Sequence, residues 1–237
     1  MYEDKTTGKP LTLNGEPIDI DKIVPRWKKA KEEQSKRTKN KAEVFTPTWI
    51  VCQMLNYIDD NCLYPNAFNV MDGKTWEPTE HIEFKGDEWK DYVLQNRIEI
   101  TCGEAPFIVT RYDPVTGEPI PIKNRVGFLD RKLRVVLENN GGYEWIKKAF
   151  QHTYGFDYQG DNVYLARCNL MDTFKDYWHG TYEQQEEIKN IINYNVWQMD
   201  GLTDKVPDTD MYAKIMDWDT GEFIEFRSLK NNDVKQG

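Results

Sequence analysis

The second half of the chain alternates between short apolar strands and longer helices, and this order constrains the fold more than any other feature. Residues 98–101, 153–158 and 194–199 have the composition of short strands. Helical periodicity fills the chain between them, at residues 125–137, 143–153, 160–175 and 182–193. Strands separated by helices are typical of a parallel α/β sheet. Ligands of such sheets bind at the carboxyl ends of the strands, so candidate functional residues are expected there.

The segments on either side of this core predict an extension and a tail. Residues 1–21 favour a hairpin that turns at Asn14-Gly15, and residues 21–38 favour a charged helix with Asp21 as its N-cap. The tail favours a second hairpin, with its turn at Thr220-Gly221. These expectations divide the chain into a hairpin and basic-helix extension (1–41), a core (42–205) and a tail (206–237).

Between the extension and the first strand, the sequence predicts one helix and an irregular region. Apolar residues at helical spacing predict a helix over 48–60, with Thr48 as its cap. Residues 61–90 are interrupted by Gly, Pro and Asn and predict a loop or a small insertion. Residues 112–122 predict an exposed hairpin with Thr116-Gly117 at its tip.

Charge limits the classes of function. The chain has 31 basic and 40 acidic residues and a net charge of −9, which argues against a protein that coats nucleic acid by itself. Basic residues nevertheless gather between residues 22 and 41, at Arg26, Lys28, Lys29, Lys31, Lys36, Arg37 and Lys39. A basic arm on an acidic body is able to contact the phosphate backbone of DNA, and a solvated helix face is an equal alternative.

Cysteine spacing and the lack of apolar runs favour a cytoplasmic protein without a metal centre. The four cysteines form no C-x-x-C pair and the three histidines form no cluster, so no zinc site is expected. No apolar run approaches the roughly 18 residues of a membrane span. The first residues lack the charged-then-apolar pattern of a signal peptide. We therefore expect reduced thiols and a cytoplasmic location.

Two segments in the first half carry candidate ligand contacts. In Ala-Glu-Val-Phe-Thr-Pro (42–47), Phe45 offers an aromatic face for stacking and Pro47 fixes φ where the chain turns into a helix. The alternative is a core Phe beside an ordinary helix start. In residues 97–107, Glu99 offers a carboxylate to a cation, and Gly103 lets the backbone approach a ligand. An ordinary strand followed by a turn is the alternative there.

Acidic residues also end the next two strands. Asp157 follows Tyr154-Gly155-Phe156, and an acid at this place in Rossmann-like folds accepts hydrogen bonds from ribose hydroxyls. Asp200 follows the third strand, within residues 195–202. A solvent-facing Asp after a strand and a common Asp-Gly turn are the alternatives.

In their order and spacing, these four segments resemble adenine-N6 DNA methyltransferases, the modification subunits of restriction–modification systems. Glu43–Pro47 resembles their motif X (E-x-F-T-P), and Glu99–Gly103 resembles motif I (D-x-x-C-G-x-G). Residues 154–170 resemble motif II with its helix (Y-G-x-E, then L-A-R-x-N-L), and residues 195–202 resemble motif III. The resemblance covers residues 42–205. It implies a partial Rossmann-like, S-adenosylmethionine-dependent methyltransferase fold with a helical N-terminal extension.

The resemblance also implies that S-adenosylmethionine is the cofactor. The implied contacts are Phe45 at the cofactor adenine, Thr46 and Pro47 at its methionine end, Glu99, Cys102 and Gly103 around the ammonium group and the methionine moiety, Asp157 at the ribose hydroxyls and Asp200 at the adenine amine. Ala105-Pro106 departs from the family, because it replaces the second glycine of motif I and stiffens the loop.

The sequence lacks the tetrapeptide that performs the family's chemistry. That tetrapeptide, [D/N/S]-P-P-[Y/F/W], accepts hydrogen bonds from the target amine and stacks an aromatic ring on the flipped base. This chain has no Pro-Pro dipeptide, and Asp217-Trp218 is only a weak candidate for a catalytic remnant. Too few residues follow Asp200 to form the remaining strands of the methyltransferase sheet. We therefore expect either that a second polypeptide supplies the catalytic half or that the fold serves another purpose.

A hypothesis from a different class is a non-catalytic acidic binding protein that reuses this fold. Acidic surfaces compete with DNA for basic clefts, so such a chain could inhibit a nuclease or a restriction or CRISPR complex, encoded on a mobile element. The expected partners are thus a second polypeptide or a nuclease complex, with DNA reached through residues 22–41. No membrane contact is expected.

Overall fold

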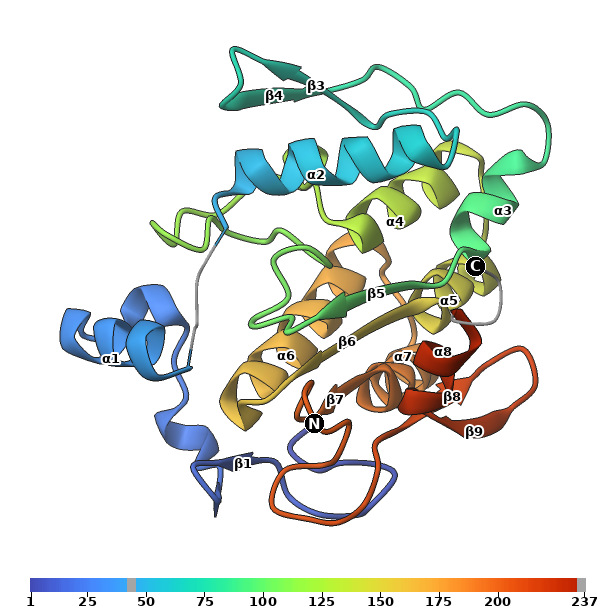
Figure 1. The fold of residues 1–237 in the computed structure, drawn as a ribbon. Helices are drawn as coiled ribbons and strands as arrows, with labels where there is room; N and C mark the ends of the chain where they lie inside the picture. Colours follow the sequence, from blue (N-terminus) through green and yellow to red (C-terminus); the bar gives the residue numbers. More distant parts are fainter. Residues whose placement is uncertain (42–45, 234–237) are drawn as a thin grey trace.

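The protein has a mixed α/β fold built on a three-stranded parallel sheet (Figure 1). The computed structural model describes residues 1–41 and 46–233. The sheet contains β5 (Arg97–Ile100), β6 (Thr153–Asp157) and β7 (Val196–Gln198), in the order β5-β6-β7. The register places Ile98 beside Tyr154 and Gly155 beside Val196. The prediction of a parallel α/β core is therefore confirmed.

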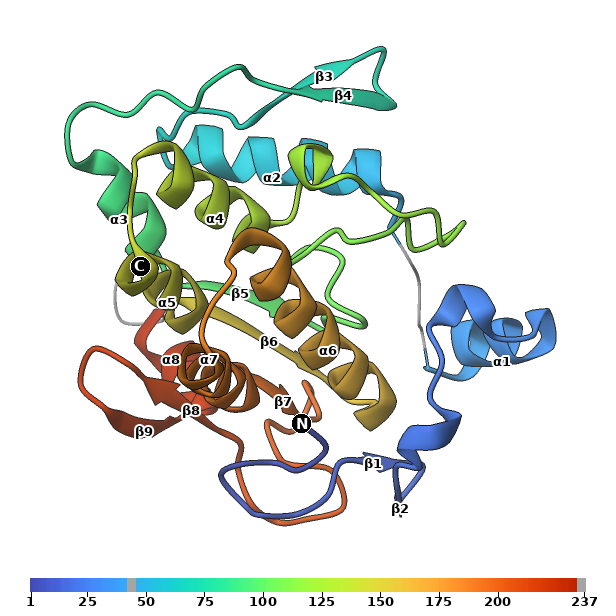
Figure 2. The same ribbon diagram turned by 180° about the vertical axis from the view of Figure 1, so that it is seen from behind.

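Helices connect the strands and cover one face of the sheet (Figure 2). They are α4 (Phe128–Glu138) and α5 (Tyr143–Gln151) between β5 and β6, and α6 (Gly160–Tyr177) and α7 (Tyr182–Asn195) between β6 and β7. A capping box begins α7, because the Thr181 hydroxyl accepts a hydrogen bond from the backbone of Gln184 and the Gln184 side chain accepts one from Thr181. Their apolar faces form one hydrophobic core with α2 (Thr48–Asn61) and α3 (Glu88–Leu94).

The C-terminal segment covers the other face over β6 and β7. It contains the antiparallel hairpin of β8 (Lys214–Asp217) and β9 (Glu222–Glu225), followed by α8 (Phe226–Asp233). A second hydrophobic cluster joins the two layers through Tyr154, Phe156, Trp197, Met199, Val206, Ala213, Ile215 and Phe226. On the same face of β5, Ile98 and Ile100 are 42% and 63% exposed. Within the described residues, β5 pairs with β6 alone.

The N-terminal extension confirms the expected hairpin and corrects the expected helix. β1 (Thr12–Leu13) and β2 (Glu16–Pro17) turn at Asn14-Gly15, which both have positive φ. The single helix predicted over 21–38 is wrong. Two 3₁₀ turns, η1 (Ile20–Lys22) and η2 (Arg26–Lys28), precede α1 (Lys31–Lys41). Pro25 separates η1 from η2, since proline lacks a backbone donor and keeps the preceding residue out of the helical region.

Other local expectations also changed. The N-cap residue of α2 is Pro47, not Thr48, which is the first residue of the helix and whose hydroxyl donates to Asp113 Oδ2 at 3.2 Å. Residues 61–90, expected to be a loop or a small insertion, contain a hairpin of β3 (Phe68–Met71) and β4 (Thr75–Pro78) and the start of α3. The hairpin expected over 112–122 has a single bridge between Tyr112 and Pro119, followed by η3 (Ile122–Asn124). No helix in the described part of the chain is long and apolar enough to cross a membrane.

A buried ionic network joins α2, β5 and α4. The fully buried carboxylate of Asp59 accepts from Arg97 Nη2 at 2.5 Å and from Arg131 Nη1 at 2.7 Å. Arg131 also donates to the backbone carbonyl of Cys52 and to Asn56 Oδ1. This network fixes the start of β5 against the helices that support it.

Asp59→Ala is expected to lower the free energy of unfolding by about 3–5 kcal/mol, because two buried guanidinium groups lose their carboxylate. Chemical denaturation measures the change. The control is Asp60→Ala, an exposed neighbour on the same helix, which should change stability by less than about 0.5 kcal/mol. A loss at Asp59 no larger than that of the control would contradict the role given to the network.

Candidate functional site

The carboxyl ends of the three parallel strands bring together the loops that follow them. After β5, three residues adopt positive φ: Thr101 (55°), Gly103 (55°) and Ala105 (70°). The Cys102 N–H donates to Phe156 O at 2.7 Å, and the Gly103 N–H donates to Asp157 Oδ2 at 2.9 Å. The loop after β5 is therefore fixed to the end of β6. Ala105 pays a strain cost in this conformation that glycine would avoid.

The side chain of Asp157 accepts hydrogen bonds from the loop after β5 and from the segment that begins α6. It is buried, and its Oδ1 accepts from Gln159 N at 2.7 Å and from Asn162 Nδ2 at 3.3 Å. Its Oδ2 accepts from Gly103 N. This carboxylate therefore fixes the loop after β5 and the start of α6 to the end of β6.

Glu99 places a second carboxyl group beside Asp157. Its Oε2 is buried without a hydrogen-bond partner in the described residues, and the backbone of Phe107 and Ile108 lies beside the carboxyl group. Burial and then the charge of Asp157 raise the pKa of Glu99 well above its usual range. Burial likewise raises the pKa of the Cys102 thiol, followed by the charges of Glu99 and Asp157. A cationic ligand group would relieve this concentration of negative charge.

Asp200 follows β7 in a tight turn. Its Oδ1 accepts from Leu202 N at 2.9 Å, and its Oδ2 accepts from Thr203 Oγ1 at 3.0 Å. Asp200 and the exposed ring of Tyr158 line one open hollow of ≈ 420 Å³. Its other lining residues are Thr203, Lys205, Val206, Pro207, Asp208, Thr209 and Asp210. The structure thus connects the ends of β6 and β7 through a shared surface hollow.

The N-terminal segment packs over the same edge of the sheet (Figure 1). The Thr12 N–H donates to Gln198 Oε1 at 2.8 Å, and Gln198 Nε2 donates to Thr12 O at 2.8 Å. A Cβ at Gly160, the first residue of α6, would lie 2.5 Å from Thr12 O, so only glycine fits there. Arg167, from the same helix, is fully buried and donates to the carbonyls of Met1 and Glu3.

Two cations of the basic arm point inward. Lys29 Nζ and Arg37 Nη1 each lie 2.8 Å from Asp161 Oδ2, and Arg37 Nη2 lies 3.1 Å from Asp161 Oδ1. Burial alone would raise the pKa of Asp161. The hydrogen bond from Arg37, then the charges of Lys29 and Arg37, outweigh burial and lower that pKa below its ordinary value. Lys29 and Arg37 are both buried, so these cations are not a solvated face.

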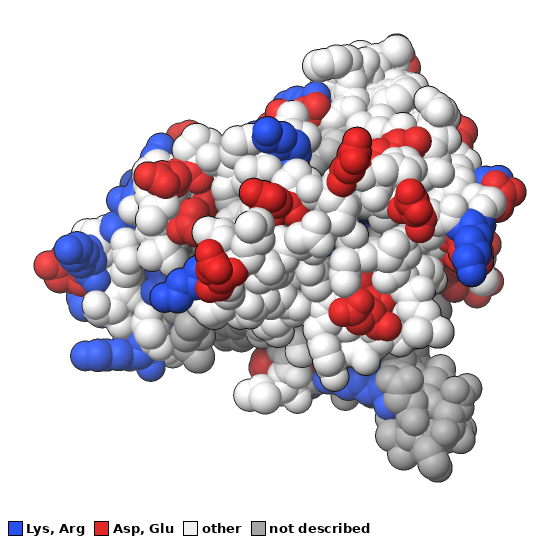
Figure 3. Space-filling model, turned by 90° about the horizontal axis from the view of Figure 1, so that it is seen from above, with Lys and Arg blue, Asp and Glu red and all other residues white. Residues whose placement is uncertain are grey.

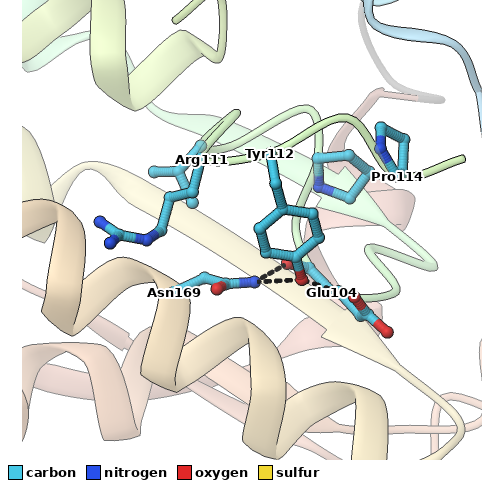
Figure 4. Close-up of a pocket in the computed structure, with 7 residues that line it drawn as sticks. Glu104, Arg111, Tyr112, Pro114 and Asn169 are labelled. Atoms are coloured by element: carbon cyan, nitrogen blue, oxygen red, sulfur yellow. Dashed lines mark hydrogen bonds between the residues drawn. The ribbon is translucent and has the colours of Figure 1, made fainter. Parts of the chain in front are cut away.

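A small pocket lies between the loop after β5 and α6 (Figure 4). Tyr112 OH donates to Glu104 Oε2 at 2.6 Å, and Asn169 Nδ2 donates to Glu104 O at 2.9 Å and to Tyr112 OH at 3.1 Å. Burial and then the charge of Glu104 raise the pKa of Tyr112. The pocket measures ≈ 10 Å³, which is room for about one water molecule. Its polar network therefore positions the loop rather than holding a larger ligand.

The structure brings only part of the predicted site together. Glu99, Cys102, Gly103 and Asp157 form one cluster, and Asp200 lies beyond it at the end of β7. Thr46 and Pro47 precede α2, and Phe45 lies outside the described residues. No group of three His, Cys, Asp or Glu residues arranged to hold a metal occurs in residues 1–41 and 46–233.

Asp217 and Trp218 are not brought to this site. Asp217 Oδ1 accepts from the N–H groups of Asp219 and Thr220 in the β8–β9 turn. Trp218 Nε1 donates at 2.8 Å to Asn195 Oδ1, directly before β7. The pair therefore lies at the amino ends of the parallel strands, opposite the candidate site, and β8 does not join the parallel sheet.

Sequence reasoning missed Gln198, Asp161 and Glu104. Gln198 is the last residue of β7, so its place at a strand end was a usable signal. Asp161 pairs with Lys29 and Arg37 across more than a hundred residues, and Glu104 accepts from Arg26 N at 2.6 Å. No local pattern identifies such pairs.

No family model, curated protein or solved structure matches this chain.

The contribution of Glu99 to the free energy of unfolding is expected to fall as the pH rises above the ordinary pKa of a glutamate. The raised pKa of Glu99 makes the folded protein hold a proton that the unfolded chain releases. Glu99→Gln removes this effect, so in urea denaturation the variant should gain stability relative to the wild type over the pH range above the ordinary pKa of a glutamate, about 4.3. Exposed Glu83→Gln is the matched control. A constant difference between Glu99→Gln and wild type over this range would refute the expectation.

Proposed function

We propose that this chain is an adenine-N6 DNA methyltransferase-like protein whose core binds S-adenosylmethionine. The observation that carries the proposal is the cluster of Glu99 and Asp157 at adjacent strand ends, tied to the positive-φ Gly103 loop. The order β5-β6-β7 supports the proposal, because it brings the segments that resemble motifs I, II and III to one edge of the sheet. A partial Rossmann-like methyltransferase fold accounts for this arrangement.

The residues of the cluster fit the parts of the cofactor. The buried, unpartnered Oε2 of Glu99 suits the ammonium group. A cation there would lower the free energy of ionising Glu99 beside the carboxylate of Asp157. A Cβ at Gly103 would meet no atom within 4 Å, so the side of that loop has space. Asp157 would accept from the ribose hydroxyls, and Asp200 and Tyr158 would flank the adenine in the shared hollow. When bound, the cofactor would supply an electrophilic methyl group for direct transfer to adenine N6.

Catalysis would need a second polypeptide. No residue of the cluster replaces the missing tetrapeptide, and Asp217-Trp218 lies at the other end of the sheet. The partner would supply the acceptor for the target amine and the aromatic ring that stacks on the flipped base. The present chain would bind the cofactor, and the basic arm would contribute phosphate contacts to DNA.

The distribution of surface charge favours a second candidate, a non-catalytic inhibitor of a nuclease or restriction complex. Figure 3 shows Asp and Glu spread over the face formed by α2 and the β3–β4 hairpin, with Lys and Arg mainly toward its margins. Such a face would compete with DNA for a basic cleft. Inhibition of a restriction nuclease by the purified chain, without cofactor binding, would favour this candidate over the first.

Isothermal titration calorimetry with S-adenosylmethionine tests the proposed function. We expect saturable binding, and Asp157→Asn should weaken it by at least about tenfold because charge-assisted hydrogen bonds to the ribose are lost. The control is Asp172→Asn, an exposed position on α6 paired with Lys175, which should bind like the wild type. No detectable binding at millimolar cofactor would remove the proposal.

A further inference from the structure

Residues 19–41, here called the arm, rest on the body of the protein through polar contacts. Within the described residues, none of the arm belongs to or packs against the two hydrophobic clusters. Its contacts include the pairs of Lys29 and Arg37 with Asp161, a bond from Arg37 to Asn162, the bond from Arg26 N to Glu104, and the Trp27 ring against Gly117. A segment held in this way separates from the body at a lower cost than one that contributes to a core.

The central contact of the arm has the chemistry of phosphate recognition. Arg37 donates to both oxygens of Asp161 through its two terminal nitrogens, and Lys29 adds a second cation at 2.8 Å. A planar guanidinium fork with a neighbouring ammonium group binds phosphate oxygens equally well. All three side chains are at most 10% exposed, and both cations are bonded to Asp161 in this conformation.

Asp161 also lies at the candidate cofactor site. It is in the first turn of α6, four residues after Asp157. It directly follows Gly160, which packs against the backbone of Thr12. The outer side of α1 carries further exposed cations, Lys31, Lys36 and Lys39. A polyanion attracted to these lysines would therefore meet the two cations that Asp161 holds.

We propose that the arm is an electrostatic lid, in which phosphates of duplex DNA compete with Asp161 for Lys29 and Arg37 and lift the arm from the carboxyl ends of the strands. The inference rests on the proposed function because it takes DNA as the partner. Once the arm lifts, Asp161 and both cations become hydrated or phosphate-bound, so no charge stays buried and unpaired. DNA binding would then uncover the start of α6 beside the cofactor site.

The experiment measures amide hydrogen exchange in the first turn of α6 (160–163) and the affinity for a short fluorescein-labelled DNA duplex. In the wild type, adding the duplex should speed exchange in this turn. Asp161→Asn should speed exchange without DNA and tighten DNA binding about tenfold, because the closed state no longer reduces the apparent affinity. Asp172→Asn makes the same change of charge at an exposed position of α6 and should do neither.

A double variant, Lys29→Gln with Arg37→Gln, separates lid opening from phosphate contact. It should speed exchange like Asp161→Asn but bind the duplex more weakly than the wild type. Unchanged exchange in Asp161→Asn, or DNA affinity no greater than that of Asp172→Asn, would overturn the proposal. So would a duplex that leaves wild-type exchange unchanged. None of these readouts uses S-adenosylmethionine, so failure of cofactor binding and failure of the lid are separate results.

Discussion

The carboxylate of Asp157 is the contact on which the geometry of the candidate site depends. It ends β6, accepts from Gly103 in the loop after β5, and accepts from Gln159 and Asn162 at the start of α6. One buried charge thereby sets the relative positions of two loops and a helix. Charge-assisted bonds of this kind are stronger than neutral ones, and burial keeps water from competing for them.

Several carboxyl groups gather at the same edge of the sheet, and only some of them are paired with a cation. Asp161 receives Lys29 and Arg37, so its pKa stays below the ordinary value although it is buried. Glu99 instead faces another carboxyl group, and its pKa is raised. A structural ion pair explains the first site. The second retains an unpartnered buried oxygen, the feature expected where a cationic ligand group belongs.

Local patterns predicted the elements of the core but failed where distant contacts or single residues decided the backbone. The helices before β6 and β7 follow from apolar periodicity, and the strand ends placed Glu99 and Asp157 near each other. Pro25 broke the helix expected over 21–38, a signal that was present in the sequence. The pairing of Lys29 and Arg37 with Asp161 was not predictable, because side chains so far apart in sequence meet only after the sheet has formed.

The sequence by itself determined the alternation of strands and helices, the acidic residues at the strand ends and the absence of a Pro-Pro tetrapeptide. These properties depend on periodicity, position and residue identity, which are local. Only the tertiary structure decided that the N-terminal segment covers the carboxyl ends, that Asp217-Trp218 lies at the opposite end, and that two cations of the arm are buried. The physical reason is that packing and ion pairing depend on distance in space, which a linear pattern does not contain.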